Sequence, residues 1–460
     1  MSLVAGVDLG TQSTRVVVCD ADSGAVLRSG SAPHPDATEV DPAVWWGAFQ
    51  EASAGLLDGV AGLAVAGQQH GLVAMDSAGT VVRPALLWND TRSAPAATDL
   101  VAELGGPDVW AYAVGSVPVA SFTVTKLRWL ARHEQELADR VDSVVLPHDW
   151  LTHRLRTSGA VSTDRGDASG TGYWSPFGAQ YRTDLVELAF GRPLGLPRVA
   201  EPAEVVGETA AGAVLGAGTG DNMAAALGLG LAPGDAVVSI GTSGTVFAVS
   251  EQPTADPSGA VAGFADATGR YLPLVCTLNA ARVLAAVGNL LGIPLSTVDE
   301  LALSAEPGAG GLTLLPYLDG ERTPNLPGAR GLVTGLTRGN ASPANLARAA
   351  VEGMLCGLAD GVDALRVVGV PVDRVLLIGG GAASAAVRAL APALLGAPVV
   401  LPEPAEYVAL GAARQAAWAL AGGPDPPQWT IKAAVAAAEP DRLIREIYAD
   451  IRGRAADLLR

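Results

Sequence analysis

The pattern that opens the chain returns, in altered form, near its middle. Residues 4–20 contain an apolar run, a polar corner at Gly10 and a second β-branched run, and residues 236–249 follow the same order around Gly241. Setting Gly10 over Gly241, an offset of 231 residues, also matches three further pairs: Thr11 with Thr242, Ser13 with Gly244, and Thr14 with Thr245. A period of about half the chain predicts two copies of one domain rather than a solenoid.

Both copies are predicted to form a β-hairpin, because apolar runs flank a short polar turn. In the first copy Asp8 stands at the mouth of the hairpin, and the turn gathers hydroxyls, an amide and main-chain N–H groups. Such a corner suits a phosphate group, although for this stretch alone an ordinary turn is the alternative. In the second copy Ser239 replaces Asp8. A single carboxylate between two phosphate turns fits metal-assisted phosphoryl transfer, since a second unpaired carboxylate would repel the phosphates.

Composition bounds the class of protein. The 460 residues suffice for two domains or three, and 49% hydrophobic with 17% charged residues is typical of a globular chain. Cys19, Cys276 and Cys356 lie far apart, which predicts neither disulfides nor a zinc site and favours a reducing compartment. With no leader-like segment and no apolar run of about 18 residues, we expect a soluble cytoplasmic protein. The net charge of −17 argues against nucleic acid as a partner.

Between the two copies, local patterns predict an alternation of strands and helices. Asp41 followed by Pro42 is a strong helix start. The expected helices are 42–56, 125–138, 148–155, 223–229, 384–395, 407–420 and 444–459. The expected strands outside the two hairpins are 25–27, 62–66, 73–75, 85–88 and 374–378. Residues 163–172 are polar and rich in glycine, and we expect a loop that is either surface or part of a site.

Two strand ends carry residues typical of ligand binding. The buried strand 62–66 ends in Gly67, Gln68, Gln69 and His70, and α/β folds place ligands at such ends. Strand 374–378 is followed by three glycines and a helix, an arrangement that can bind a nucleotide. A tight turn with no ligand is the alternative interpretation of the glycines.

These features together resemble the FGGY family of carbohydrate kinases, over about residues 4–420. Residues 121–133 (SFTVTKLRWLARH) resemble the first signature of the family, and residues 331–352 (GLVTGLTRGNASPANLARAAVE) resemble the second. Within the family the likeness is to xylulokinases, because residues 68–71 resemble their GQMHG segment, and residues 87–90 and 167–171 also look like theirs. Gluconokinases can carry a similar Met-His pair.

The resemblance implies an α/β fold of duplicated RNase H-like domains, of the actin/Hsp70/hexokinase type, flanking a cleft. We place the N-terminal domain at residues 1–222, with the sugar and Mg²⁺/phosphate side, and the C-terminal domain at residues 223–460, with the ATP side.

The resemblance also implies a role for each candidate residue. Asp221 would be the general base, with helix capping alone as its alternative, and Asp8 would hold Mg²⁺, through water. The proposed sugar ligands are Gln69, His70 and Asn222. The proposed nucleotide and phosphate contacts are Thr11, Gln12, Arg15, Gly241, Thr242, Gly380, Gly381 and Ala382. Position 385 is Ala where several relatives have Asn, so adenine would be held by packing and main-chain contacts. Asp164 and Asp167 border either the sugar site or a surface loop.

The resemblance thus implies ATP-dependent, Mg²⁺-assisted phosphorylation of D-xylulose to D-xylulose 5-phosphate, a step of xylose catabolism that feeds the pentose phosphate pathway. The partner is a small ketose, with neither nucleic acid nor membrane, and a homodimer is left open. The alternatives are a gluconokinase or another polyol or ketose kinase of the family, and, from a different class, a non-catalytic actin-like ATPase or a sugar-sensing regulator. A regulator would be expected to carry a helix-turn-helix, and no basic helical extension is evident at either end.

Overall fold

The computed structural model describes residues 2–455, which fall into two compact units. The first unit contains the described residues up to Leu231, then Glu251–Leu272 and Ala405–Thr430. The second unit contains Ala232–Ser250, Pro273–Pro404 and the described residues from Ile431 on.

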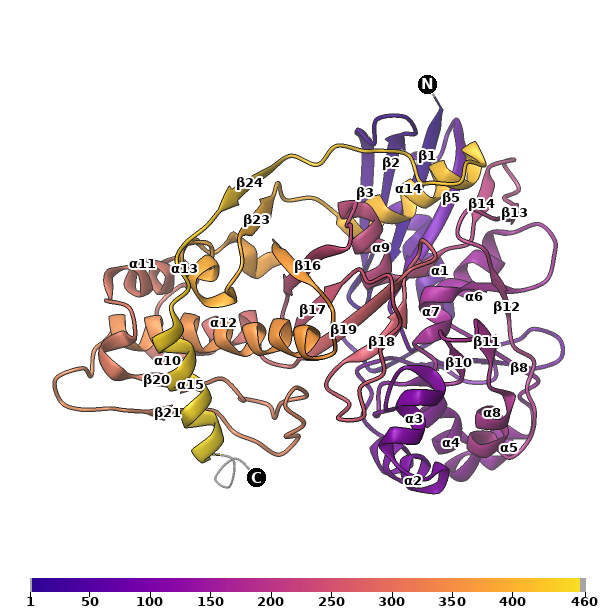
Figure 1. The fold of residues 1–460 in the computed structure, drawn as a ribbon. Coiled ribbons are helices and arrows are strands. Elements are labelled where there is room, and N and C mark those ends of the chain that lie inside the picture. Colours follow the sequence, from indigo (N-terminus) through magenta and orange to yellow (C-terminus); the bar gives the residue numbers. More distant parts are fainter. Residues whose placement is uncertain (1, 456–460) are drawn as a thin grey trace. The chain divides into compact units, whose positions relative to one another are not determined.

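The sheet of the first unit grows from the opening hairpin (Figure 1). Its strand order is β13 (Val205–Glu208), β14 (Val214–Gly216), β5 (Val60–Gly67), β1 (Leu3–Leu9), β2 (Ser13–Asp20) and β3 (Val26–Pro33). Strands β1, β2 and β3 form an antiparallel meander, whereas β5 is parallel to both β1 and β14. A short strand, β15 (Thr219–Gly220), pairs in parallel with the end of β5.

The sheet of the second unit repeats this plan. Its order includes β19 (Tyr271–Thr277), β17 (Gly244–Ala248), β16 (Gly234–Ile240), β22 (Val372–Ile378), β23 (Val399–Pro402) and β24 (Ala433–Ala436). Here β16, β17 and β19 are antiparallel, β22 is parallel to β16 and β23, and β24 is antiparallel again. Six strands of each sheet correspond in order and direction, which confirms the predicted duplication.

The two hairpins differ in the length of their turns. In the first, Leu9 pairs with Thr14, whereas in the second Ile240 pairs with Gly244. The second turn is thus one residue shorter, so the offset of 231 holds for the first strand only. Along the second strand the offset is 230, and Thr245 occupies the place of Arg15. The predicted matches of Thr14 with Thr245 and of Ser13 with Gly244 were wrong by one residue.

The core of the first unit covers both faces of its sheet. On one face, the Trp45 and Phe49 side chains of α1 (Pro42–Ala52) pack with Trp150. On the other, α14 (Tyr407–Ala421) lies so close that a Cβ added to Gly6 would be 1.9 Å from the Ala409 carbonyl oxygen. Helix α14 also packs against α9 (Asp221–Leu229). Both helices therefore belong to the first unit, although the sequence assigned most of their residues to the C-terminal domain.

Two predicted elements differ from the structure. The helix expected over 125–138 is two helices, α4 (Thr123–His133) and α5 (Gln135–Ala138), because Glu134 leaves the helical region at φ −130° and ψ 57°. The loop expected over 163–172 is wrong. That segment holds strand β9 (Ser162–Asp164) and helix α7 (Arg165–Ser169), and most of their residues are buried. The short helix forms because the Asp164 carboxylate caps it.

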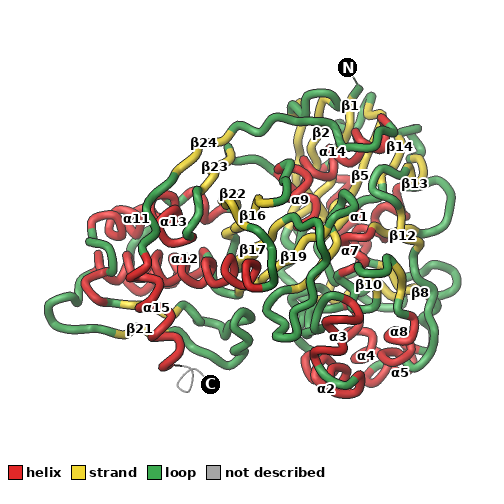
Figure 2. The backbone as a smooth tube through the Cα atoms, viewed as in Figure 1, coloured by secondary structure: helices red, strands yellow, loops and turns green. Residues whose placement is uncertain are grey.

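The remaining elements complete the two units (Figure 2). In the first unit they are β4 (Glu39–Val40), β6 (Val73–Met75), β7 (Ala85–Leu86), α2 (Ala94–Leu104), α3 (Pro107–Val114), β8 (Ser143–Val145), α6 (Pro147–Leu155), β10 (Trp174–Ser175), β11 (Gln180–Tyr181), α8 (Thr183–Phe190), β12 (Arg198–Ala200) and β18 (Ala262–Ala265). In the second they are α10 (Ala281–Leu291), α11 (Leu295–Ser304), η1 (Ala309–Gly311), β20 (Thr313–Leu315), β21 (Leu332–Thr334), α12 (Pro343–Val367), η2 (Gly380–Ala383), α13 (Ala385–Leu395) and α15 (Arg442–Ala455).

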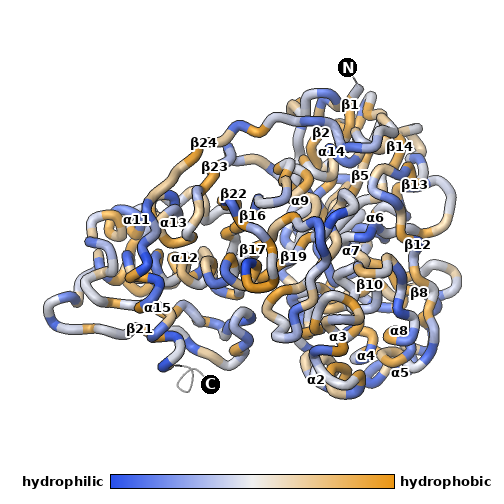
Figure 3. The backbone as a smooth tube through the Cα atoms, in the orientation of Figure 1, coloured by the Kyte–Doolittle hydropathy of each residue, from blue (hydrophilic) through white to orange (hydrophobic). Residues whose placement is uncertain are grey.

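The C-terminal helix α15 carries many hydrophilic residues, as Figure 3 shows, and in it only Tyr448 and Ala455 are buried. The part of its predicted range beyond Ala455 lies outside the described residues. Among residues 2–455, no single helix is long and apolar enough to cross a membrane, and only the bent pair α10 and α11 meets those criteria jointly.

Candidate active site

Asp8 lies next to the end of β1 and is 5% exposed. Its register partner on β2 is Arg15, whose Nη1 donates to Asp8 Oδ2 over 3.4 Å. Burial raises the pKa of the Asp8 carboxyl to about 6, against the lowering effect of Arg15, and the nearby Glu406 charge raises it further. The site therefore holds a carboxylate that a cation would stabilise.

Asp221 is the first residue of α9, directly after β15. Its Oδ1 accepts from the main-chain N–H and from Nδ2 of Asn222, at 2.8 and 2.9 Å. The N-cap of the helix is Gly220, with no side-chain cap, so capping alone does not explain the aspartate. Burial raises the pKa of Asp221 to about 7, with the Asp8 charge as the next cause. Asp221 is thus poised to accept a proton near neutral pH.

Asp8 and Asp221 belong to the same edge of the first sheet. Asp8 pairs with Ala66 on β5, and Gly220, the residue before Asp221, pairs with Gly67 one position further along β5. The ends of β1, β5 and β15 therefore meet here, as ligand sites in α/β sheets do.

The predicted sugar ligands form part of this edge. Asn222 Nδ2 donates to Gln69 Oε1 over 3.1 Å, while the buried Gln69 Nε2 has no hydrogen-bond partner among the described residues. His70 Nδ1 lies 2.6 Å from the Gly170 carbonyl oxygen, and its ring stacks on Phe122 with centroids 4.7 Å apart. Because a carbonyl only accepts, His70 Nδ1 carries the proton. The unpaired amide donor of Gln69 is a group that a sugar oxygen would satisfy.

In the first turn, the Thr11 hydroxyl is already engaged. It accepts from Trp88 Nε1 at 2.8 Å and donates to Gln68 Oε1 at 3.4 Å. The side chain of Thr11 therefore holds the turn in place, while the Gln12 residue is exposed. The turn is closed by a hydrogen bond from Gly10 N–H to the Ser13 carbonyl.

In the second unit, helix α10 packs against the turn after β16. The N–H of Ala281 donates to the Gly241 carbonyl at 3.0 Å, and Arg282 Nε donates to the Thr242 carbonyl at 3.3 Å. Arg282 also pairs with Asp319 at 2.7 Å. These contacts place a guanidinium beside the second predicted phosphate turn.

The glycine turn after β22 packs on the end of β16. A Cβ on Gly381 would lie 2.3 Å from the Ile240 Cγ2 atom, so only glycine fits there. The following helix, α13, begins at Ala385, one residue later than predicted. Its N-terminus is occupied, because the Asp299 carboxylate accepts from Ser384 Oγ and from the Ala385 N–H, at 2.5 and 2.9 Å. A nucleotide would therefore meet the turn itself rather than the helix end.

Comparison with known proteins agrees with this geometry. The model of the FGGY carbohydrate kinase N-terminal domain matches residues 3–230, and that of the C-terminal domain matches residues 236–420. The chain belongs to the FGGY family of carbohydrate kinases.

Individual family members are similar over nearly the whole chain. The xylulose kinase of Streptomyces coelicolor is 49% identical over 436 residues, which cover 91% of this chain and 88% of that protein. The crystal structure of xylulose kinase from Bifidobacterium adolescentis has a TM-score of 0.92 at 46% identity, covering 98% of this chain and 99% of that one. The gluconate kinase of Lactobacillus acidophilus shares the fold alone, with a TM-score of 0.88 at 24% identity and coverage of 99% and 98%.

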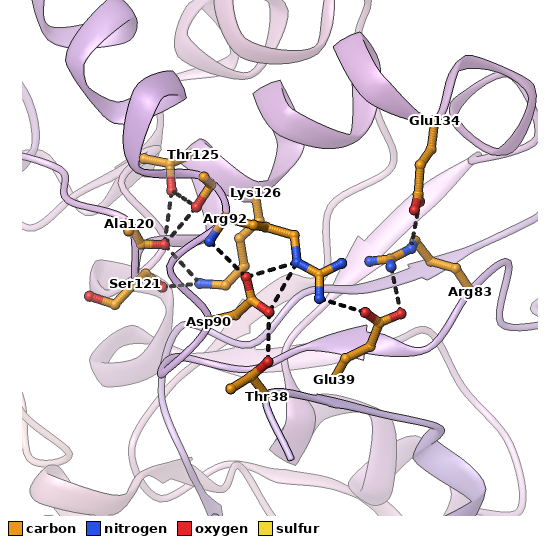
Figure 4. A network of polar contacts seen from close by, with 11 residues as sticks. Thr38, Glu39, Arg83, Asp90, Arg92, Ala120, Ser121, Thr125, Lys126 and Glu134 are labelled. Carbon is orange, nitrogen blue, oxygen red and sulfur yellow. Dashed lines mark hydrogen bonds and ion pairs between the residues drawn. The ribbon is translucent and has the colours of Figure 1, made fainter.

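The segment 121–133, which resembles the first FGGY signature, takes part in a network of polar contacts (Figure 4). The buried Lys126 donates its ammonium hydrogens to the carbonyls of Ala120 and Ser121, and Thr125 Oγ1 donates to the Phe122 carbonyl at 2.8 Å. These bonds fix the turn that carries Phe122 against the His70 ring. A second part of the network is ionic, with Glu39, Arg83, Asp90, Arg92 and Glu134 as its members.

Sequence reasoning missed several residues of the site in this FGGY kinase. In the first unit, Glu406 reaches Arg15 only through tertiary packing, and in the second unit Arg282 and Asp299 reach their turns in the same way. Trp88, which donates to the Thr11 hydroxyl, lies in the segment 87–90 that was marked by resemblance alone. The polar residues at the ends of β1 and β5 were the features of the sequence that indicated the site.

Proposed function

We propose that this FGGY kinase transfers the γ-phosphoryl group of ATP to D-xylulose, at its terminal hydroxyl, giving D-xylulose 5-phosphate and ADP. The observation that carries the proposal is the set Asp221, Asn222 and Gln69 beside Asp8, in a chain 49% identical to a xylulose kinase.

The base in the proposed mechanism is Asp221. It takes the proton of the attacking hydroxyl as the sugar oxygen bonds to the γ-phosphorus, and the bond from that phosphorus to the bridging oxygen of ADP breaks. Base catalysis of this kind contributes typically about 10²- to 10⁴-fold, and positioning with charge neutralisation contributes the rest. The raised pKa of about 7 suits the task, because a large share of Asp221 is ionised at neutral pH and that carboxylate is more basic than an ordinary one.

Sugar recognition is assigned to three side chains of the first unit. The unpaired Nε2 of Gln69 is a donor for a sugar oxygen, and we place His70 and Asn222 on neighbouring hydroxyls. In each of the three, one polar atom is already bonded to the protein, which holds the side chain in one orientation before the sugar arrives.

The nucleotide contacts are proposed on both turns. Arg15 and the main-chain groups of Thr11 and Gln12 would bind phosphate oxygens, and Gly241 and Thr242 would do so from the second unit. The turn of Gly380, Gly381 and Ala382 would lie against the adenosine.

We propose Mg²⁺ as the metal, held by the Asp8 carboxylate through water. The buried Asp8 carboxylate, whose pKa burial raises to about 6, is a group that gains from a cation. No cluster of three or more His, Cys, Asp or Glu suited to a metal occurs within residues 2–455. Magnesium in phosphoryl-transfer enzymes uses one or two carboxylates with waters and substrate phosphates, so the residues present fit it. When bound, the ion would neutralise phosphate charge.

A panel of sugars in an ADP-release assay tests the substrate. We expect D-xylulose to give the largest kcat/KM, with D-gluconate, D-ribulose and glycerol as competitors. A preference for gluconate would overturn the substrate and keep the family.

The variant Asp221→Asn tests the base. We expect it to fold and to lose kcat by roughly 10²- to 10⁴-fold, with the sugar KM little changed. Turnover near that of the unmodified enzyme would refute the mechanism.

A further inference from the structure

Beneath the sugar ligands lies a buried ionic cluster that the proposed mechanism does not use. It is formed by His148, Asp149, Asp164 and Asp167, each at most 2% exposed. His148 Nδ1 lies 2.6 Å from Asp167 Oδ2, and His148 Nε2 lies 3.1 Å from Asp149 Oδ1. The Nδ1 contact is a hydrogen bond, whereas Nε2 and Asp149 Oδ1 lie close together without hydrogen-bond geometry. Carboxyl groups on both sides of the ring favour its imidazolium form.

The surrounding fold is shaped to hold this ring. A Cβ added to Gly218 would lie 2.5 Å from His148 Cδ2, and one added to Gly67 would lie 2.9 Å from His148 Cβ. Burial would lower the pKa of His148, but the facing carboxylates, Asp149 on its own helix and Asp167 and Asp164 on the adjoining segment, raise it to about 9. Breaking such a pair strands the remaining charge in the core, so the cluster constrains its segments strongly.

Two chains of hydrogen bonds lead from the cluster to the site. In the first, Asp167 belongs to α7, and the carbonyl of Gly170, the residue that ends α7, accepts from His70 Nδ1 at 2.6 Å. In the second, Asp164 caps α7 through the N–H groups of Gly166 and Asp167 and accepts from Thr219 Oγ1 at 2.7 Å. Thr219 lies two residues before Asp221.

We propose that His148 is a positioning residue for phosphoryl transfer: its imidazolium, held between Asp149 and Asp167, fixes α7 so that Gly170 orients the His70 ring and Asp164 holds the strand that presents Asp221. The inference rests on the roles proposed above for His70 and Asp221. In this proposal the fully buried His148 affects sugar binding through His70 and proton transfer through Asp221, by two separate routes.

The state of the ring can be tested in the unmodified protein. Nitrogen-15 NMR of histidine-labelled enzyme, with His148→Gln for assignment, should show His148 with both ring nitrogens protonated at neutral pH. A neutral imidazole at that pH would overturn the proposal whatever the variants do.

Kinetics then separate positioning from a general effect on folding. In His148→Gln, we expect the sugar KM to rise and kcat to fall, each by roughly 10-fold or more, while the KM for ATP stays within about 2-fold.

In Thr219→Val, which breaks only the route to Asp221, we expect a lower kcat with a sugar KM changed by less than about 2-fold. Equal changes in both KM values of His148→Gln, or no change in kcat of Thr219→Val, would contradict the proposal.

A control comes from a second ionic network of the same unit, in which the buried Arg128 pairs with the exposed Glu103. Arg128 is 6% exposed and donates to Glu103 and to the carbonyls of Leu188 and Ala189, none of which belongs to the segments above. Arg128→Gln should lower Tm and leave all kinetic constants within about 2-fold. If His148→Gln does not fold, Thr219→Val still decides, and the His148 signal is assigned by elimination with single variants of the other four histidines. An active Asp221→Asn enzyme would refute the base itself without changing the NMR result, so the two failures are distinguishable.

Discussion

The two hairpins are built on one plan and end in different chemistry. The first hairpin carries Asp8 with Arg15 as its register partner, whereas the second has Ser239 in register with Thr245 and a turn one residue shorter. The first adjoins a second carboxylate, Asp221, and the second is held by Arg282 from α10. The same order of strands occurs in the sheets of both units. The first hairpin lies beside anionic side chains, which we propose hold the metal and accept a proton, whereas the second presents main-chain and cationic groups, which we propose contact the nucleotide.

The largest expected effect comes from removing the charge of Asp8, compared with a change at the equivalent residue of the second hairpin, Ser239. Asp8→Asn should fold and lower kcat by roughly 10²-fold or more, because the proposed Mg²⁺ would lose its anionic partner in the protein and phosphate charge would be less neutralised. Ser239→Ala, the matched change in the second hairpin, should leave kcat within about 3-fold. Steady-state kinetics at saturating Mg²⁺ compare them, and similar losses in both variants would mean that the hairpins share the metal role.

The pH dependence of kcat/KM tests the charge of Asp221, the carboxyl group beside the first hairpin. The pKa of Asp221 is raised to about 7 by burial and then by Asp8, and the base must be ionised to act. kcat/KM should therefore be full above that pH and fall roughly 10-fold per unit below it. A pH profile measured against the sugar checks this. An acid limb near the ordinary carboxyl value of 3.8 would show that the free enzyme does not raise this pKa.

A smaller effect is expected from the cation of the second hairpin. Arg282→Gln removes the guanidinium beside Thr242 and leaves the first unit untouched. The KM for ATP should rise by roughly 3- to 10-fold while the sugar KM stays constant. A changed sugar KM with an unchanged ATP KM would contradict the division of labour between the hairpins.

The smallest effect concerns stability. Asp299→Ala leaves the N-terminus of α13 with one acceptor fewer, and the loss of such a cap costs about 1 kcal/mol. Tm should fall by a few degrees, and the KM for the sugar should not change. Thermal unfolding with matched kinetics would measure both, and an unchanged Tm would mean that water replaces the carboxylate without cost.

Local sequence was sufficient where the signal was local. Neighbouring residues predicted the two hairpins, the strand just before Gln69 and His70, and the helix start at Asp41. All of these elements are present. The register of the second hairpin was not, because a turn of one residue fewer leaves no mark in the apolar pattern. Helix α7 was missed because five residues cannot show helical periodicity, and it is held by the Asp164 cap and by His148 from another helix. The roles of Arg282 and Asp299 depend on contacts across the chain and could not be read in advance.

The closeness of α14 to the first sheet bears on how the chain is made. Gly6 lies on the opening strand, and a Cβ added there would meet the backbones of Ala409 and Ala413, about four hundred residues later in the sequence. Until α14 leaves the ribosome, one face of the opening sheet lacks its natural cover, and the second unit is synthesised during that interval. The nascent chain therefore spends most of its synthesis with an apolar surface uncovered, which makes the first unit a candidate client for chaperones that bind such surfaces.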